Sequence, residues 1–246
     1  AARLQGLRED PAVAFVSEDR EVSIAAQSLP TGVNRIEGDA SSTVAGNGGG
    51  SVDVGVAVID TGVGPHGDLN ITGGKNCNGG GTSYADGNGH GTHVAGTIGA
   101  RDNTAGVVGV APGARIYAVR VLNSQGSGTW AQVICGVDWV TANAASLGIK
   151  VANMSLGGGG SDDGNCGKTN ADALHKAICG SVAAGVTYVV AAGNSGVDFA
   201  SSAPASYDEV LTVTAVADFN GGPGGGAAST CRSDVDETAA DFSNFA

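Results

Sequence analysis

Three polar residues of types that carry out acyl transfer stand where a short apolar run of the sequence ends or a helical pattern begins. Asp60 closes the run 54–60, His90 opens the segment His-Gly-Thr-His-Val-Ala-Gly, and Asn194 follows the run 186–192. A carboxylate that holds an imidazole makes a general base, and an amide N–H stabilises the charge that builds on a carbonyl oxygen. Taken singly, Asp60 and Asn194 are also ordinary turn residues. Together the three residue types are compatible with the general base and the oxyanion donor of an acyl-transfer site.

The histidine segment allows a second interpretation, because His90 and His93 lie about one helical turn apart and zinc is bound by imidazoles. The segment lacks the acidic residue that stands between the histidines of metalloprotease helices, and no further histidine or cysteine cluster stands nearby. We therefore favour a general base over a zinc site.

A parallel sheet would bring these residues together. Valine-rich runs alternate with segments of helical period, which is typical of a parallel sheet with helices on both faces. The sequence thus predicts an α/β fold, a three-layer doubly wound sandwich with a mainly parallel sheet, whose functional groups gather at the carboxyl ends of the strands. Strands are expected over 54–59, 116–121, 150–153, 186–191 and 210–215, and helices over 129–145 and 170–184.

The composition limits the partners that the protein can have. The 246 residues are 41% hydrophobic, enough for one sizeable core, and the formal net charge is −12. This charge repels nucleic-acid phosphates and anionic membranes, and no apolar stretch is long enough to span a bilayer. We expect a monomer that binds neither nucleic acid nor membrane.

Five cysteines indicate an oxidising compartment and therefore a secreted, extracellular protein. Cys166 and Cys179 are close enough in sequence to close a modest loop. Because the count is odd, one cysteine must be left over, either as a buried inert thiol or as a thiol with a partner outside this sequence.

A glycine pattern raises nucleotide binding as a further interpretation, since residues 62–67 satisfy Gly-x-Gly-x-x-Gly after an apolar run. Pyrophosphate binding needs such glycines to open a helix. Pro65 and residues 68–74 predict a loop instead, so we reject nucleotide binding at this segment.

Taken together, the motifs Asp60-Thr-Gly, His90-Gly-Thr-His-Val-Ala-Gly and Ala-Ala-Gly-Asn194 resemble those of the subtilisin-like serine proteases, in the family's order. The similarity extends over nearly the whole region 26–242. It implies a subtilisin-like fold and an endopeptidase that acts on polypeptides. It also implies that His90 is the general base, that Asp60 orients it, that Asn194 is the oxyanion donor and that His93 is structural.

The resemblance also implies where a substrate would bind. Two edge segments would hold an extended peptide by backbone hydrogen bonds, and Trp130 would line the pocket for the fourth residue before the cut. The edge segments contain Ser127, Gly128, Ser155, Leu156 and Gly157, and the pocket at the cut is lined by Leu156, Ala191, Ala192 and Gly193. Trp130 also fits the apolar stripe of the helix expected over 129–145, so a core position stays open.

A structural calcium site is implied in the same way. Side chains of Gln27, Asp68 and Asn103 would bind the ion together with main-chain oxygens of Arg101, Ala105 and Val107. Calcium prefers such flexible coordination by oxygen alone. An ordinary surface loop is the alternative.

The first part of the chain resembles the tail of the family's inhibitory propeptide. The expected division is 1–25 as propeptide tail and 26–246 as peptidase domain, incomplete at its C-terminus. Self-cleavage would follow Ala25, with Val22 facing the Trp130 pocket, and the propeptide would be an intramolecular inhibitor.

The family carries its nucleophile in Gly-Thr-Ser-Met-Ala, whereas the Gly-Thr-Ser at 81–83 precedes the His90 motif and lacks a following helix. Residues 241–245 match a strand that comes before the nucleophile. We therefore expect the catalytic serine beyond this chain, which by itself would be inactive. The alternative is a pseudoenzyme that binds extended peptides without cutting them.

Overall fold

The structure is a computed structural model that describes Gln5, residues 10–14 and residues 26–246. Most of the segment expected to be a propeptide tail, including Val22 and Ala25, lies outside the described residues. The division of the chain at residue 25 therefore stays a prediction.

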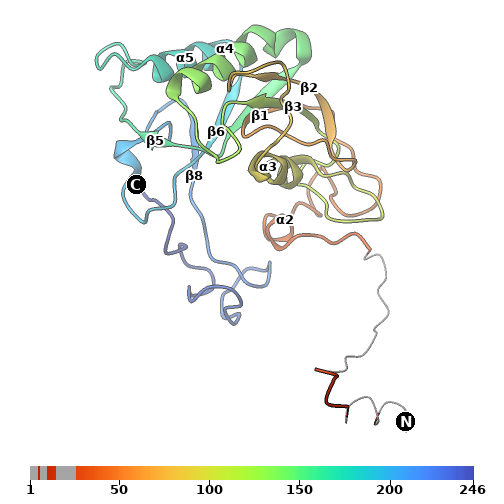
Figure 1. The fold of residues 1–246 in the computed structure, drawn as a ribbon. Coiled ribbons are helices and arrows are strands. Elements are labelled where there is room, and N and C mark those ends of the chain that lie inside the picture. The colour runs from red at the N-terminus through yellow and green to blue at the C-terminus, as the bar shows by residue number, and fades with distance from the viewer. Residues whose placement is uncertain (1–4, 6–9, 15–25) are drawn as a thin grey trace.

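A six-stranded parallel sheet forms the centre of the fold (Figure 1). Valine-rich strands lie in its middle, where both faces are covered and apolar side chains are favoured on both. In spatial order the strands are β2 (Asn70–Asn76), β3 (Arg115–Arg120), β1 (Gly55–Asp60), β4 (Ile149–Met154), β6 (Thr187–Ala191) and β8 (Leu211–Val213). The five predicted strands are confirmed, with shifted ends.

The prediction of a loop over 68–74 is wrong, because strand β2 occupies most of it. β2 is an edge strand of polar and glycine residues, so it lacks the apolar run that marks the inner strands. Gly74 has a role there, since a Cβ at this position would lie 2.1 Å from the carbonyl oxygen of Ala118 on β3. The segment still opens no helix, so the argument against a pyrophosphate loop holds.

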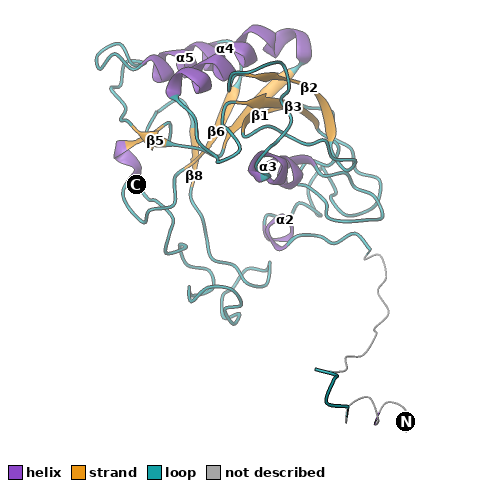
Figure 2. Cartoon of the chain, viewed as in Figure 1, coloured by secondary structure: helices purple, strands orange, loops and turns teal. Residues whose placement is uncertain are grey.

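Helices cover both faces of the sheet (Figure 2). α4 (Trp130–Leu147) and α5 (Ala173–Ala183) pack on one face in a core that includes Ile59 and Tyr188. α3 (His90–Gly99) packs on the other face in a second core. The predicted three-layer α/β architecture is thus confirmed.

α4 shows how local sequence sets a helix. Thr129 and Gln132 form a capping box, and Gly148 ends the helix with φ of 66°. Between these ends Val133, Val137 and Val140 form a fully buried stripe toward the sheet.

Shorter elements complete the described chain. They are helix α2 (Thr31–Arg35), the 3₁₀ turn η1 (Phe199–Ser201), and an antiparallel pair formed by β5 (Gly158–Gly159) and β7 (Ser202–Ala203). Among the described helices none has the length and apolar character needed to cross a membrane. The strand expected at 241–245 is absent, and that segment makes only an isolated bridge between Phe245 and Asp198.

Two disulfides join Cys77 to Cys135 and Cys166 to Cys179. The second is the short loop that the spacing suggested. Cys231 is the free cysteine and is exposed, so the interpretation of the leftover cysteine as a buried thiol is wrong. It lies in a glycine-rich segment without regular secondary structure, where no apolar core forms to bury it.

Candidate active site

Asp60 and His90 are in contact at the carboxyl end of β1. Asp60 is fully buried as the last residue of the strand, and His90 is the first residue of α3. His90 Nδ1 lies 2.8 Å from Asp60 Oδ1 and 2.9 Å from Oδ2. The carboxylate accepts the Nδ1 proton, so Nε2 keeps a lone pair on a side chain that is 49% exposed. This is the arrangement of an oriented general base.

His93 takes no part in this pair. It is exposed and lines a separate, largely apolar groove beside α3, together with Pro65, His66 and Leu69. The two imidazoles of the His-x-x-His segment therefore face different depressions of the surface.

Asp86 connects the Asp60 end of β1 to the start of α3, and the sequence analysis missed it. Its carboxylate accepts hydrogen bonds from the hydroxyl of Thr61, from the backbone N–H groups of Gly89 and Thr92, and from the Thr92 hydroxyl. Burial alone would raise the pKa of Asp86, but these bonds outweigh it and lower the pKa to about 2. An acidic residue four positions before His90, where helix N-termini favour carboxylates, was the available signal.

His90 lies on the wall of a cleft of about 710 Å³. The structure brings both predicted edge segments to this cleft, with Ser127 and Gly128 from one and Ser155, Leu156 and Gly157 from the other. Trp130 lines it as well and also packs against the α4 core, so both interpretations of this residue hold. Its ring sits over Gly158, where a Cβ would lie 2.7 Å from Trp130 Cζ2.

A second depression adjoins the first and shares the wall formed by residues 155–159. Ala191, Ala192, Gly193 and Asn194 line it. Asn194 is exposed at the end of β6, so its amide faces solvent within the depression. All the residues predicted to bind substrate or to donate to an oxyanion thus surround one bipartite cleft.

Asn244 holds the segment after β6 in place and was also missed. Its Nδ2 donates to the Ala192 carbonyl at 2.9 Å, and its Oδ1 accepts from the N–H groups of Ser195 and Val197. Gly193 has φ of 109°, and a Cβ there would lie 2.5 Å from Asn244 Nδ2. The buried amide of Asn244 therefore fixes the backbone on both sides of Asn194.

Hydrogen bonds link the six residues predicted to bind calcium, although Ala105 takes part through its N–H and not through the carbonyl oxygen that was predicted as a ligand. Gln27 Nε2 lies 2.7 Å from the Arg101 carbonyl oxygen and 3.4 Å from that of Val107, and Asn103 Nδ2 donates to Asp68 Oδ1. Asn103 Oδ1 accepts from the Ala105 N–H at 2.8 Å.

This donor set fits a calcium ion. The carbonyl oxygens of Arg101 and Val107 face the Gln27 amide, and the Asp68 carboxylate faces the Asn103 amide. In each case the N–H group provides the positive partner that a cation would provide. Gln27 Oε1 accepts from the Asn103 backbone N–H at 3.2 Å, so turning the amide to present Oε1 to an ion would break that bond, and the ion would have to compensate for the loss. The neighbouring Asp102 instead accepts from the Gly46 N–H.

A comparison with known proteins identifies the family. The family model described as the subtilase family matches residues 51–246. The chain belongs to the subtilase family. The chain is also similar to a protein of known crystal structure, a cold adapted subtilisin-like serine proteinase, with 36% sequence identity and a TM-score of 0.60. The matched region is 79% of this chain and 60% of that one.

Individual subtilases are similar at about the same level. An alkaline protease of Alkalihalobacillus alcalophilus is 42% identical over 212 residues, which are 86% of this chain and 51% of that protein. Subtilisin DY of Bacillus licheniformis is 43% identical over 195 residues, which are 78% of this chain and 65% of that protein. This subtilase chain therefore spans about half to two thirds of the length of these relatives.

Proposed function

We propose that the protein to which this chain belongs is a serine endopeptidase that hydrolyses polypeptides. The observation that carries the proposal is the contact of His90 Nδ1 with the buried Asp60 carboxylate on the wall of a cleft built for an extended chain. The relatives named as proteases and subtilisins support it.

The nucleophile in this proposal is a serine outside the 246 residues. Within the described chain the His90 ring is hydrogen-bonded to Asp60, and no serine hydroxyl is hydrogen-bonded to it. The serine hydroxyl attacks the peptide carbonyl while His90 Nε2 takes its proton and later transfers it to the leaving amine. Asp60 keeps the imidazole in the required tautomer and stabilises its charged form.

Asn194 serves as the oxyanion donor. Asn244 and β6 hold the backbone on both sides of Asn194, and this supports an amide placed at the cleft before substrate binds. A preorganised N–H group aimed at the developing negative charge lowers the barrier without a cost of reorganisation.

The substrate would lie between residues 127–128 and 155–157 as an added extended strand. Gly128 and Gly157 let its backbone approach closely, and Trp130 receives the apolar side chain of the fourth residue before the cut. Leu156 and residues 191–193 contribute small, uncharged side chains to the pocket at the cut, and none of its lining residues is ionisable, which favours uncharged substrate side chains.

Calcium, the propeptide and secretion complete the proposal. A calcium ion bound by Gln27, Asp68 and Asn103 with the three carbonyls would tie the segment before α2 to the loop after α3. Residues 1–25 would inhibit the cleft until cleavage after Ala25. Two disulfides support the extracellular location in this proposal, and the enzyme would act as a monomer.

Casein hydrolysis by the full-length protein and its His90→Ala variant tests the function. We expect hydrolysis by the wild type and its loss in the variant, while His93→Ala, an exposed imidazole on the same helix, retains it. Wild-type protein that binds peptides without cleaving them would instead support a pseudoenzyme. Unchanged hydrolysis in His90→Ala would contradict the catalytic role.

A further inference from the structure

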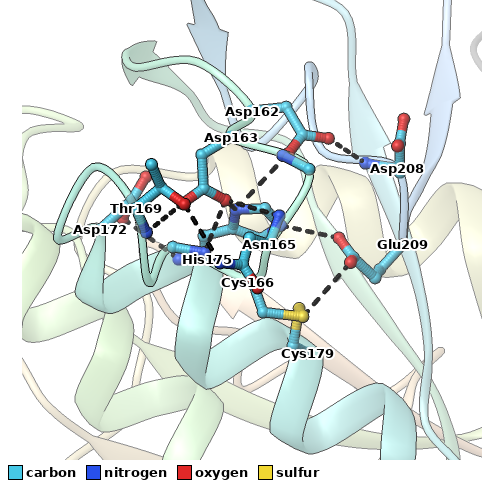
Figure 3. Close-up of a disulfide and its surroundings, with 12 residues drawn as sticks. Asp162, Asp163, Asn165, Cys166, Thr169, Asp172, His175, Cys179, Asp208 and Glu209 are labelled. Atoms are coloured by element: carbon cyan, nitrogen blue, oxygen red, sulfur yellow. Dashed lines mark hydrogen bonds and ion pairs between the residues drawn. A yellow bond between two sulfur atoms is a disulfide. The ribbon is translucent and has the colours of Figure 1, made fainter.

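A second cluster of ionisable groups lies outside the cleft, around His175 on α5 (Figure 3). The imidazole is completely buried, although histidines are seldom so. It stacks on the ring of Tyr207, with centroids 4.1 Å apart and planes at 4°. Nothing in the proteolytic proposal uses this residue.

One nitrogen of His175 is satisfied and the other is not. Nε2 lies 2.8 Å from Glu209 Oε2, so the carboxylate fixes the Nε2–H tautomer. Nδ1 is buried and has no hydrogen-bond partner among the described residues. It points at two carboxylates, with Asp163 Oδ1 at 3.4 Å and Asp162 Oδ1 at 3.8 Å.

The two carboxylates are held firmly in this place. Asp163 is buried and accepts backbone N–H bonds from Asn165, Gly167, Thr169 and Asn170. Burial opposes ionisation, but these four bonds outweigh it and hold the pKa of Asp163 well below its ordinary value. Asp162 accepts from the N–H groups of Gly164 and Asp208.

A positive charge is therefore needed between His175 Nδ1 and the carboxylates of Asp162 and Asp163. The lone pair of a neutral Nδ1 would face two carboxylate oxygens, which is repulsive in a buried setting. Within the described part of the chain neither carboxylate has a lysine or arginine at ion-pair distance, and His175 is their only basic neighbour there. A bound cation, or a proton on Nδ1, has to balance the cluster.

The geometry favours a metal over a proton. A proton on Nδ1 would not be well bonded here. Asp163 Oδ1, the nearest carboxylate oxygen, is 3.4 Å from Nδ1, and the pair does not have the geometry of a hydrogen bond. Tetrahedral zinc with bonds of about 2.0–2.2 Å separates neighbouring ligand atoms by about 3.4 Å, close to the two distances observed. An imidazole nitrogen among carboxylates suits zinc better than calcium, which prefers oxygen alone.

We propose that Asp162, Asp163 and His175 form a structural site for a divalent transition metal of the zinc type. The ligands are His175 Nδ1 and one oxygen of each carboxylate, which together lie within 4.8 Å of one another. Asp162 is 18% exposed and leaves room for a water molecule as the fourth ligand. The metal ties the loop 160–172 to α5, beside the Cys166–Cys179 disulfide (Figure 3).

Zinc binding by the full-length protein tests the proposal. The chelator-treated protein is titrated with Zn²⁺ by calorimetry in excess Ca²⁺, and bound metal is measured by elemental analysis. We expect Asp162→Asn to weaken the tightest zinc binding by about tenfold or more. Asp208→Asn removes an exposed carboxylate next to Glu209 and should change the affinity by no more than about twofold. The wild type and both variants keep His90 and His93, so any weak zinc binding by these exposed imidazoles is the same in all three proteins and does not affect the comparison.

A measurement on the wild type covers the case in which Asp162→Asn fails to fold. The ¹⁵N resonances of the His175 ring are recorded with and without Zn²⁺ at neutral pH. We expect Nδ1 to move to a metal-bound shift while Nε2 stays protonated. A ring that is protonated on both nitrogens and insensitive to Zn²⁺ would show that a proton balances the carboxylates. That result, or equal zinc affinity in wild type and Asp162→Asn, overturns the proposal.

Discussion

His90 Nδ1 lies 2.8 Å from Asp60 Oδ1, so the imidazole that opens α3 and the carboxylate that ends β1 share one proton across thirty positions of sequence. The contact exists because β1 ends in the sheet interior and α3 begins directly against it. Gly91 makes this approach possible, since a Cβ there would lie 2.1 Å from the Gly62 carbonyl oxygen.

Asp60→Asn should lower kcat of the full-length protein by about 10⁴-fold at neutral pH, the loss that the wrong imidazole tautomer causes in serine proteases. The amide can donate to Nδ1, which would leave the proton on Nε2. Peptide hydrolysis measured with a chromogenic substrate gives the value. Asp53→Asn, at an exposed carboxylate paired with Arg115, is the control and should keep full activity. An active Asp60→Asn enzyme would remove Asp60 from the mechanism.

Asn194→Ala should lower kcat with little change in KM, because the amide acts on charge that develops only in the transition state. Loss of the oxyanion-hole amide in subtilisin, a member of this family, costs about 10²–10³-fold in kcat, and we adopt that magnitude. Ser195→Ala, at the next exposed position, serves as the control. A rise in KM at constant kcat would instead assign Asn194 to ground-state binding.

Asp86 should make the active-site end of α3 sensitive to acid. Its pKa is about 2 in the folded protein against 3.8 in a free side chain, so the folded state holds the carboxylate ionised. Its contribution to stability is complete above about pH 4 and is lost as the pH falls toward 2. Asp86→Asn should therefore lower the melting temperature at pH 7 and flatten its dependence on pH between 4 and 2. Equal acid sensitivity of wild type and variant would contradict this assignment.

Gly158→Ala should disturb the pocket of Trp130. The new Cβ would lie 2.7 Å from the indole ring, so the ring must move toward the cleft. We expect a lower kcat/KM for peptides with a large apolar residue four positions before the cut, and an altered tryptophan emission spectrum. Gly159→Ala adds a Cβ with nothing within 4 Å and separates this effect from a general loss of glycine. Identical selectivity in both variants would show that Trp130 is only a core residue.

Calcium removal should lower the free energy of unfolding of the protein. A ligand present at about 100 times its Kd stabilises the folded state by about 2.7 kcal/mol, and chelation withdraws that amount. Equilibrium unfolding by denaturant in EDTA and in calcium measures this difference in the free energy of unfolding. Asp68→Asn should reduce the difference between the two conditions, whereas Asp39→Asn, at an exposed carboxylate away from the site, should not. An EDTA-resistant wild type would exclude a structural calcium ion at this place.

The central strands were predictable because burial on both faces demands long apolar runs. β1 and β3 have apolar, buried centres and are fully paired, and the polar residues at their ends stood out against these centres. β2 gave no such signal, since an edge strand buries little and Gly74 is selected by close packing on β3 rather than by hydrophobicity.

The contacts that position the site were not predictable from motifs. Asn244 binds backbone groups of a segment about fifty residues earlier, and Asp86 joins nearby N–H groups to the Thr61 hydroxyl on the neighbouring strand end. A sequence pattern does not specify which of these segments meet. In the sequence, His175 lies in the segment of helical period that forms α5, where nothing distinguishes it from an ordinary surface or core residue. Only its burial between Glu209 and two aspartates indicates a further role.

The most direct test of the account is the reaction of the full-length protein with a fluorophosphonate, followed by mass spectrometry. The account predicts one adduct per chain on a serine outside residues 1–246, formed rapidly by wild type and not by His90→Ala. An adduct that forms equally fast in His90→Ala, or none on a protein that hydrolyses casein, would contradict it.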